Sequence, residues 1–476
     1  MPDGFRPVFP VFPVLAGAAG VGESSLMPSP GSGPPASASS PPPAGGGGGA
    51  SFAAWYAVSV LTLANVSSFV DRQILTLLVV PIRRDLGISD TEMSFLLGLG
   101  FAVFYTLLGF PIARLADRAS RRGIIAAGVA VWSVMTALCG AARNYGQLLL
   151  ARIGVGVGEA ALSPPAYSLI ADHFPRERLG TAIGVYSMGI YLGVGLAQLI
   201  GGAVVAAVGG QAEVALPLVG GVRPWQVVFF VVGLPGLLVA LLTLTLREPP
   251  RRGGGPASIP LRDVVAYFLS HRGAFLTHHM GVALIALCNY GMGSWLPTFF
   301  VRTYGWSVSD AGYLLGAANL TFGIAGVVLA GRLSDAWQSR GVTDAKMRVC
   351  LGAGVGLLVC DVAAPLMPTG TLAALWIFPL SFFASAPFGV AAAAVQELVP
   401  DRMRAQASAL YLFVVSIVGL TAGPTAVALA TDYVFRDDAA LRYSLSLVTG
   451  LGLVAATAVL ASGLSRYRRT LAALPR

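Results

Sequence analysis

Five ionisable side chains lie inside apolar segments that are long enough to cross a lipid bilayer. They are Asp71, Arg72, Arg152, Glu159 and Asp361. A charged group at the centre of a bilayer costs roughly 2.5–3.5 kcal/mol on insertion scales, so such groups persist where they are paired or functional. Arg152 and Glu159 are two helical turns apart, so they share one face of a helix but are separated by about 10 Å. Each therefore needs another partner.

These residue types could bind and release a proton. Burial disfavours a charged carboxylate, whereas a nearby guanidinium group favours it, so a carboxyl group balanced between the two can exchange a proton when the Arg moves. We predict that Asp71 and Glu159 carry the proton, and that Arg72 switches between these two carboxylates or turns towards an anionic group of a substrate. The alternative is a static charge pair that fastens two helices together. For Arg152 we expect a structural role, holding its helix to the first helix or to the loop after the second; the alternative is contact with the substrate.

The composition explains why these charges stand out. Of the 476 residues, 55% are hydrophobic and 11% are charged, against about 25% charged residues in soluble domains. This excludes an ordinary soluble enzyme, a disordered protein and a nucleic-acid-binding protein. The four cysteines lie in apolar runs and form no CxxC pair, so we expect no metal site and no disulfide framework.

Apolar runs alternate with short polar loops from about residue 52 onwards. A helix needs about 20 apolar residues to cross a bilayer, and the sequence contains twelve runs of that kind. They span roughly residues 53–80, 92–116, 122–140, 145–170, 181–208, 225–246, 274–301, 309–333, 348–367, 371–396, 403–430 and 441–465. The fold class is therefore an all-α membrane protein.

The charged loops predict the orientation of these helices. Most of the 31 Lys and Arg residues fall in alternate loops, on the side that also holds both chain ends. Basic loops stay in the cytoplasm, so we expect both termini there. The net charge of +9 then reflects membrane topology rather than a polyanionic partner.

The longest internal loop divides the membrane region into two sets of six helices. The predicted organisation has a low-complexity N-terminal segment, two six-helix bundles joined by a cytoplasmic loop, and a short cytoplasmic tail. The N-terminal segment is rich in Pro, Gly and Ser, and we expect it to be disordered. The boundaries are residues 1–51, 52–247, 248–273, 274–466 and 467–476.

Two loops of the first half recur in the second half. Residues 114–117 (Arg-Leu-Ala-Asp) match residues 332–335 (Arg-Leu-Ser-Asp), and residues 172–175 match residues 397–400, at offsets of 218 and 225 residues. Such internal repeats are typical of secondary transporters, whose substrate site lies between the halves. We predict gating roles at these helix ends; the alternative is ordinary loop charges. The gating candidates are Asp117, Arg118, Arg121, Asp335 and Arg332.

Polar side chains within the apolar helices are candidates for lining a substrate cavity. Each could instead satisfy a backbone group or lie between helices. These candidates are Asn65, Tyr105, Tyr167, Tyr191, Asn289, Tyr290 and Asn319.

These motifs resemble the major facilitator superfamily. Residues 113–122 (Ala-Arg-Leu-Ala-Asp-Arg-Ala-Ser-Arg-Arg) are similar to its loop motif after the second helix, with Ala113 and Ser120 in place of two glycines. Within the superfamily the chain is similar to the spinster-like group, including its bacterial members, through Val70-Asp71-Arg72, residues 156–160 (Gly-Val-Gly-Glu-Ala) and Trp295-Leu296-Pro297. The resemblance implies a major facilitator fold with two pseudo-symmetric six-helix bundles. It also implies contact between Arg72 and Glu159.

The resemblance implies a proton-coupled secondary transporter that works by alternating access on an amphipathic, sphingolipid-like or lysolipid-like substrate. The alternative cargo is a small organic anion or a drug-like molecule. We expect no enzymatic activity; Ser294 near His278 and His279 is the one weak hint of a nucleophile with a base. We expect no cofactor beyond a proton gradient and no nucleic acid. The expected partners are the lipid bilayer and the substrate, and we expect a monomer in a bacterial inner membrane.

Overall fold

The computed structural model describes residues 51–473 apart from 117, 218, 251–260 and 401–402. The predicted N-terminal segment, residues 1–51, therefore lies almost wholly outside the described residues. Ser51 caps the first helix, because its hydroxyl accepts a hydrogen bond from the backbone N–H of Ala54. Such a cap satisfies one of the free N–H groups at a helix start.

The first half of the described chain consists of helices and one short strand pair. Its helices are α1 (Phe52–Leu77), α2 (Val79–Leu86), α3 (Asp90–Ser94), α4 (Gly100–Ala116), α5 (Arg121–Ala141), α6 (Tyr145–Glu159), α7 (Ser163–His173), α8 (Arg176–Val208) and α9 (Pro224–Leu244). A π-helical turn, η1 (Phe95–Leu99), joins α3 to α4. The strands β1 (Val214–Leu216) and β2 (Gly220–Val222) pair antiparallel, with Ala215 opposite Gly221.

The second half repeats this order of long helices. Its helices are α10 (Leu261–Ser270), α11 (Arg272–Tyr304), α12 (Val308–Ala318), α13 (Ile324–Ser339), α14 (Ala345–Leu366), α15 (Gly370–Ser385), α16 (Pro387–Glu397), α17 (Arg404–Ser416), α18 (Gly423–Leu429) and α19 (Leu441–Ala473). The turns η2 (Asn319–Gly323), η4 (Ile417–Ala422), η5 (Ala430–Phe435) and η6 (Asp438–Ala440) connect them.

Eleven helical stretches of the described residues are long and apolar enough to cross a membrane. The predicted segment at 145–170 is not among them, because it is divided into α6 and α7 by a turn at residues 160–162. Together the two short helices occupy the place of one more crossing. The twelve predicted segments are thus all helical. Besides 145–170, the segment 53–80 is interrupted at Leu78 and the segment 371–396 at Ala386.

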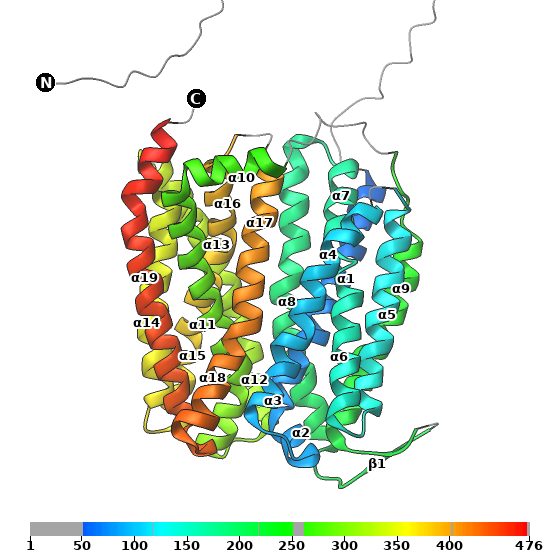
Figure 1. Ribbon diagram of the computed structural model, residues 1–476. Helices are drawn as coiled ribbons and strands as arrows, with labels where there is room; N and C mark the ends of the chain where they lie inside the picture. The colour runs from blue at the N-terminus through cyan, green and yellow to red at the C-terminus, as the bar shows by residue number, and fades with distance from the viewer. Residues whose placement is uncertain (1–50, 117, 218, 251–260, 401–402, 474–476) are drawn as a thin grey trace, which may run out of the picture. The chain divides into compact units, whose positions relative to one another are not determined.

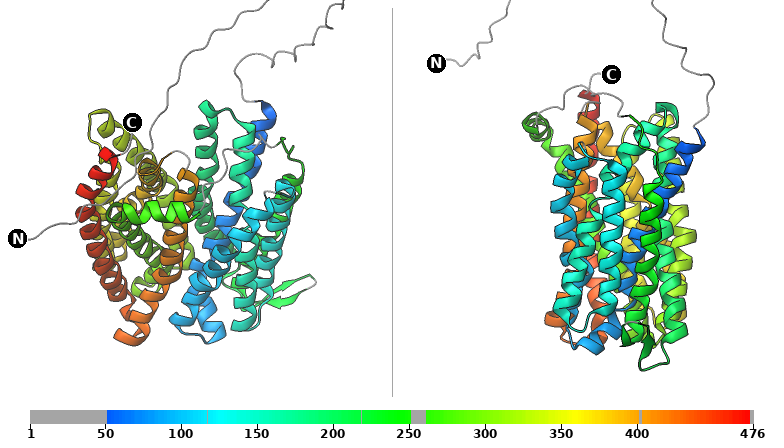
Figure 2. Two further views of the ribbon diagram at one scale, coloured as in Figure 1. Left: turned by 45° about the horizontal axis from the view of Figure 1, so that its top comes forward. Right: turned by 90° about the vertical axis from the view of Figure 1, so that its right-hand side faces the viewer.

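The two halves stand side by side, with their long helices roughly parallel (Figures 1 and 2). We call the end at which α1 begins and α19 ends the terminal face, and the other end the opposite face. The strand pair lies at the opposite face, and α10 lies across the terminal face of the second half. The predicted loop at 248–273 contains the helix α10. The predicted tail, residues 467–476, is helical as far as Ala473, where α19 ends.

The apolar cores show where the halves meet. One core takes buried side chains from both halves, including Leu77 and Leu96 with Trp295 and Phe299, close to the opposite face. The other two cores lie within one half each, apart from Leu420 of the second half, which joins the core of the first. Apolar burial therefore joins the halves mainly near the opposite face.

Candidate functional site

An ion pair joins α1 to α6 inside the first half. Nη2 of Arg72 lies 2.5 Å from Oε2 of Glu159, and the hydroxyl of Ser68 donates to the same oxygen at 2.6 Å. The Glu159 side chain is fully buried and that of Arg72 is 10% exposed. The structure therefore forms the predicted contact between Arg72 and Glu159. It also adds Ser68, one helical turn before Arg72.

Glu159 is the last residue of α6, and the local sequence explains why the helix stops there. Pro164 and Pro165 begin α7. A proline has no backbone N–H, so these two cannot continue the hydrogen-bond ladder of α6. Upstream, Gly156 and Gly158 let α6 approach its neighbours, since a Cβ atom would lie 2.6 Å from the Phe101 carbonyl oxygen and the Trp132 nitrogen, respectively.

Asp71 and Arg152 lie close to this pair but do not form an ion pair with each other. The Asp71 side chain is fully buried, and neither of its carboxylate oxygens has a hydrogen-bond donor among the described residues. Arg152 donates to backbone carbonyls, from Nη1 to that of Asp71 at 3.1 Å and from Nε to that of Leu96 at 3.4 Å. Arg152 therefore ties α6 to α1 and η1, as a structural residue would.

Aromatic rings surround the guanidinium group of Arg72. Its Cζ lies 4.4 Å from the ring centre of Phe101, 4.7 Å from that of Phe69 and 5.2 Å from that of Tyr105. A cation over an aromatic face is stabilised by about 0.5–2 kcal/mol. Tyr290, from α11 of the second half, packs against the core of the first half and lies near the Arg72 guanidinium group. Arg72 thus lies where the two halves meet.

The other predicted cavity residues divide into two groups. The asparagines satisfy backbone carbonyls: Asn65 donates to Tyr186, Asn289 to Ala384 and Asn319 to Leu315, each at 2.9 Å. Two of the tyrosines face other aromatic rings. Tyr105 stacks on Phe101, and Tyr167 meets Tyr186 edge to face. Tyr191, on α8, is half-buried.

The terminal-face end of the first half contains a second ionic cluster. Arg121 begins α5 and is 1% exposed. Its Nη1 pairs with Asp172 at the end of α7, and its Nε lies 3.3 Å from Glu248 after α9. Partial burial works against ionisation of Glu248, but hydrogen bonds from the Ser120 hydroxyl and from Arg121 hold its pKa below the ordinary value. Arg121, a predicted gating residue, binds within its own half.

The second half has a matching cluster. Nζ of Lys346, at the start of α14, lies 2.6 Å from Glu397 at the end of α16 and 2.5 Å from the amide oxygen of Gln338. The hydroxyl of Tyr467, on α19, donates to Glu397 at 3.2 Å. Lys346 follows Arg121 by 225 residues, and Glu397 follows Asp172 by the same offset. The internal duplication therefore extends to three-dimensional contacts.

The remaining gating candidates are not brought together. Asp117 lies outside the described residues. Arg118, Asp335 and Arg332 are exposed, and within the described ranges none of these three side chains forms an ion pair. The hypothetical nucleophile and base are also apart, because Ser294 lies sixteen residues beyond His278 on α11, roughly 24 Å along the helix.

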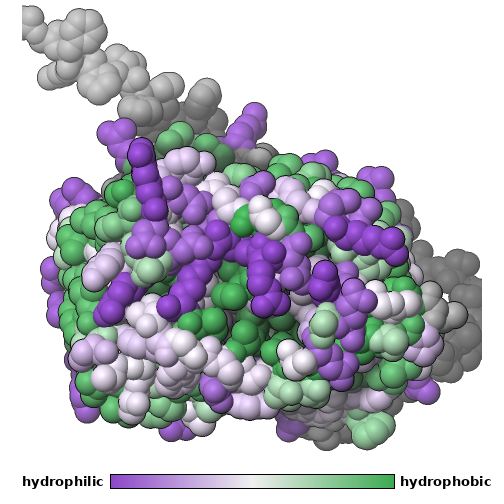
Figure 3. Space-filling model, turned by 90° about the horizontal axis from the view of Figure 1, so that it is seen from below, coloured by the Kyte–Doolittle hydropathy of each residue, from purple (hydrophilic) through white to green (hydrophobic). Residues whose placement is uncertain are grey.

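Charged contacts join the halves at the opposite face, where hydrophilic residues form a band across the molecule (Figure 3). Arg302, on α11, binds both carboxylate oxygens of the buried Asp90 at 2.7 Å each. Arg83, on α2, lies 2.7 Å from Asp438. Asp432 accepts hydrogen bonds from the backbone N–H of Thr91 at 2.7 Å and from its hydroxyl at 2.6 Å. We call these three cross-half contacts the opposite-face lock.

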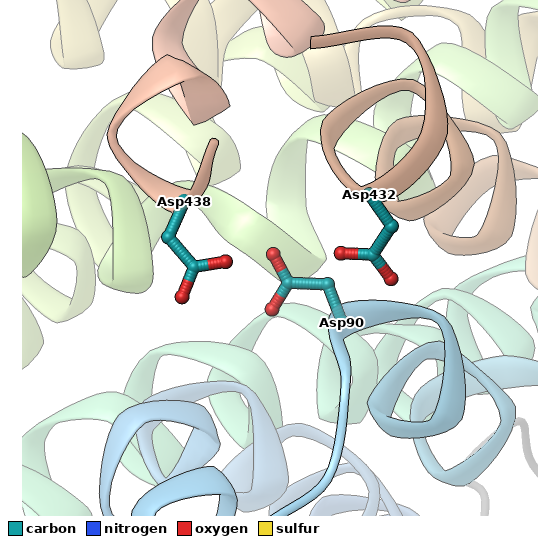
Figure 4. Close-up of side chains that lie close together, drawn as sticks. All are labelled: Asp90, Asp432 and Asp438. Carbon is teal, nitrogen blue, oxygen red and sulfur yellow. The ribbon is translucent and has the colours of Figure 1, made fainter. Parts of the chain in front are cut away.

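Three carboxylates of the lock gather in one place. Asp90, from the first half, lies between Asp432 and Asp438 of the second (Figure 4). One oxygen from each lies within 4.8 Å of the others, an arrangement that could hold a cation. Arg83 lies 3.1 Å from Asp90 as well as binding Asp438, and Arg302 binds Asp90. The guanidinium groups of Arg83 and Arg302 therefore already neutralise negative charge of Asp90 and Asp438, as a bound cation would.

Sequence patterns did not reveal the opposite-face lock. In the two terminal-face clusters they pointed to Arg121 and to the repeat that contains Asp172 and Glu397, but not to Lys346. Residues 89–92 (Ser-Asp-Thr-Glu) form a capping box, a signal that marks a helix start but not a partner in the other half. The repeat at 172 and 397 did include two cluster acids, and applying its offset to Arg121 would have found Lys346. Ser68 carried no signal beyond its place one turn before Arg72.

The sequence matches the family model of the Major Facilitator Superfamily over residues 61–424. The chain belongs to this superfamily. Major facilitator proteins are multi-pass membrane transporters, and the helical fold described above agrees with that membership.

Relatives within the superfamily identify the group. The chain is 31% identical to an MFS-type efflux pump of Mycolicibacterium smegmatis, over 87% of this chain and 94% of that protein. It is 25% identical to the protein spinster of Drosophila melanogaster, over 87% and 70% of the two chains.

A solved structure places the chain in the spinster-like group. It is the inward-facing, unoccupied form of a bacterial homologue of the human lysosomal transporter Spinster. The match has a TM-score of 0.71 and 30% identity, and covers 89% of this chain and 98% of that one. The predicted major facilitator fold and the spinster-like resemblance are thus confirmed.

Proposed function

We propose that this spinster-like transporter couples proton movement to the transport of an amphipathic, lipid-like substrate by alternating access. One observation carries the proposal: a buried carboxylate, Glu159, is paired with an arginine that lies where the two halves meet. Oε2 of Glu159 binds both Arg72 and Ser68, whereas Oε1 has no hydrogen-bond partner among the described residues.

The pair can act as a proton switch. When Arg72 binds Glu159, the carboxylate is stabilised in its charged form. When Arg72 turns towards an anionic group of a substrate, Glu159 loses its counter-charge in apolar surroundings and takes up a proton. Asp71, which also lacks a hydrogen-bond donor, lies close enough to act on Glu159 electrostatically. It is the second proposed proton carrier.

The surroundings of Arg72 favour a substrate with an anionic head and an apolar body. Phe69, Phe101 and Tyr105 provide apolar and aromatic surface beside the guanidinium group. A sphingosine-1-phosphate transporter of Danio rerio, 23% identical to this chain, supports a lipid-like cargo. A probable L-galactonate transporter of Escherichia coli, 26% identical, and a probable galactarate/D-glucarate transporter of Bacillus subtilis, 25% identical, support the small organic anion of the second candidate.

The proposal also specifies an orientation and a working unit. The excess of arginines in the loops of the terminal face supports a cytoplasmic terminal face, in a bacterial inner membrane. The closed lock at the opposite face agrees with a cytoplasm-facing conformation. We infer that the protein works as a monomer, with the proton gradient as its driving force and no cofactor.

The decisive experiment uses the purified protein in proteoliposomes under an imposed pH gradient. The probe is a fluorescent lysophospholipid, and the variants are Glu159→Gln and, as a control, Glu213→Gln, which changes an exposed glutamate near the strand pair. Glu159→Gln should lose gradient-driven uptake but keep exchange of the probe without a gradient. Glu213→Gln should behave like the wild type.

Two outcomes would refute separate parts of the proposal. Full gradient-driven uptake by Glu159→Gln would exclude its role in coupling. Wild-type uptake of a labelled sugar acid or a lipophilic dye, with no uptake of the lysophospholipid, would exclude the lipid-like cargo and favour the second candidate.

A further inference from the structure

The second half contains a buried carboxyl group that the proposed transport mechanism does not use. Asp361, on α14, has no exposed surface. Neither of its carboxylate oxygens has a hydrogen-bond partner within the described part of the chain. An isolated carboxylate in such a place is strongly disfavoured unless it is paired or neutralised.

Three helices enclose Asp361, and their nearby polar groups are uncharged. The thiol of Cys288, on α11, and the side chain of Thr449, on α19, both lie near the Asp361 carboxyl group. The Cys288 thiol itself donates to the Thr449 carbonyl at 3.5 Å, and the Thr449 hydroxyl donates to the Leu445 carbonyl at 2.8 Å. These contacts form a polar junction within the bundle.

On α11 the other titratable groups away from the helix ends are Tyr290, two residues beyond Cys288, and the pair His278 and His279, about two turns after the helix start. Cys360 is next to Asp361 on α14, and α15 carries no titratable side chain. Arg442, at the start of α19, donates to the backbone carbonyls of Pro365 and Met367. On α16 and α13, Glu397 and Asp335 lie towards the terminal face. No cation of the described residues pairs with Asp361.

The first half offers an instructive counterpart. Asp71, on α1, is equally buried and lacks a hydrogen-bond donor, but it lies near Arg152 and near Trp132 of α5. The position in α5 that precedes Asp361 by 225 residues is Thr136, which is fully buried and has an unpartnered hydroxyl. Asp71 and Asp361 are thus both buried carboxyl groups without a hydrogen-bond donor among the described residues, and of these two only Asp71 has a nearby arginine.

We propose that Asp361 is a proton-binding site of the second half, which binds a proton in this conformation and does so independently of the Arg72–Glu159 pair. The bound proton allows the carboxyl group to remain in the dry junction of α11, α14 and α19. The site requires neither the proposed substrate nor the proposed coupling. It adds a second place at which the protein can exchange a proton.

Infrared spectroscopy of the protein in liposomes tests this directly. The carbonyl stretch of a protonated, buried carboxyl group is recorded for the wild type, Asp361→Asn and Asp361→Glu. We expect a band in the wild type at neutral pH that is absent from Asp361→Asn and shifted, but present, in Asp361→Glu. The band should persist in Glu159→Gln and Asp71→Asn, which separates this site from the proposed coupling residues.

A proton count provides the second measurement. Wild-type protein shifted from strongly alkaline to neutral buffer should take up one more proton than Asp361→Asn. If Asp361→Asn does not fold, the shifted band of Asp361→Glu decides the question. A wild-type spectrum in which Asp361 contributes a carboxylate band at neutral pH would overturn the proposal, as would a protonated band that disappears when Na⁺ is added.

Discussion

Glu159 and Arg152 lie on one helix face but meet different partners. Glu159 binds side chains, Arg72 and Ser68, whereas Arg152 binds the backbone carbonyls of Asp71 and Leu96. Side-chain partners can exchange during a transport cycle, but backbone partners move only with their whole helix. The two residues should therefore respond differently to substitution.

For Arg152→Met we predict a loss of stability. The change removes two buried hydrogen bonds from a charged donor, and such a bond contributes about 1.5–3 kcal/mol. Unfolding can be followed through the reaction of the four buried cysteines with a thiol-specific dye. The melting temperature should fall clearly, and Arg143→Met, at an exposed position, should leave it unchanged. Equal melting temperatures for both variants would contradict the structural role.

For Glu248→Gln we predict a pH-dependent loss of stability. The pKa of Glu248 is lowered in the folded state despite partial burial, because Ser120 and Arg121 donate hydrogen bonds to it. Its ionised form therefore stabilises the fold above the unfolded pKa of about 4.3, and this contribution disappears as the pH falls through the lower folded value. Glu248→Gln should melt earlier than the wild type at neutral pH and together with it in acid. A difference that grows in acid would contradict this account.

At the scale of elements, α6 is the helix on which the site depends. Its glycines bring α4 and α5 close, and its end places Glu159 opposite α1. Periodicity predicted an unbroken segment over 145–170, because both α6 and α7 are apolar. The break follows from Pro164 and Pro165, which were visible in the sequence but which a hydropathy pattern does not register.

For Gly158→Ala we predict a loss of about 1–3 kcal/mol, since overpacking forces neighbouring atoms apart. The added Cβ would lie 2.6 Å from the Trp132 nitrogen and 2.8 Å from the Gly128 carbonyl oxygen. The matched control is Gly146→Ala on the same helix, whose Cβ would meet nothing closer than 3.6 Å. Thermal unfolding should separate the two, and equal stability would mean that α5 and α6 can move apart freely.

Other elements show what sequence patterns can and cannot reveal. The twelve segments and their grouping into halves followed from hydropathy, because long apolar runs have few alternatives in a membrane protein. Helix α10 was missed, since ten residues are too few for a spanning run. The lock was missed because residues such as Asp90 and Arg302 are brought together only by the packing of the two halves.

At the scale of the whole molecule, the ionic clusters are arranged asymmetrically between the two faces. The lock joins the first half to the second at the opposite face. At the terminal face, Arg121 and Lys346 each bind within their own half. The described ionic contacts therefore hold the halves together at one face only.

For Asp90→Asn we predict a shift towards a state that is open at the opposite face. The change removes the charge that Arg302 binds, and a hydrogen bond to a charged group contributes about 1.5–3 kcal/mol. Spin labels at two exposed positions, Arg84 in the first half and Tyr433 in the second, report the separation of the halves. Their distance distribution should gain a longer component.

The control for this measurement is Asp310→Asn, which changes an exposed acid at the start of α12 that bonds to Ser307. It should leave the distance distribution unchanged. An unchanged distribution in Asp90→Asn would mean that apolar packing alone keeps this face closed.

The cluster around Lys346 has a practical consequence, because Lys346 is the single lysine of the chain. A lysine-specific protease has one cleavage site, and an amine-selective acylating reagent has one side chain to modify. Lys346 is 9% exposed and bound to Glu397, so both reactions should be slow while the cluster is intact. The rate of either reaction then reports when the contact between Lys346 and Glu397 opens, without any engineered residue.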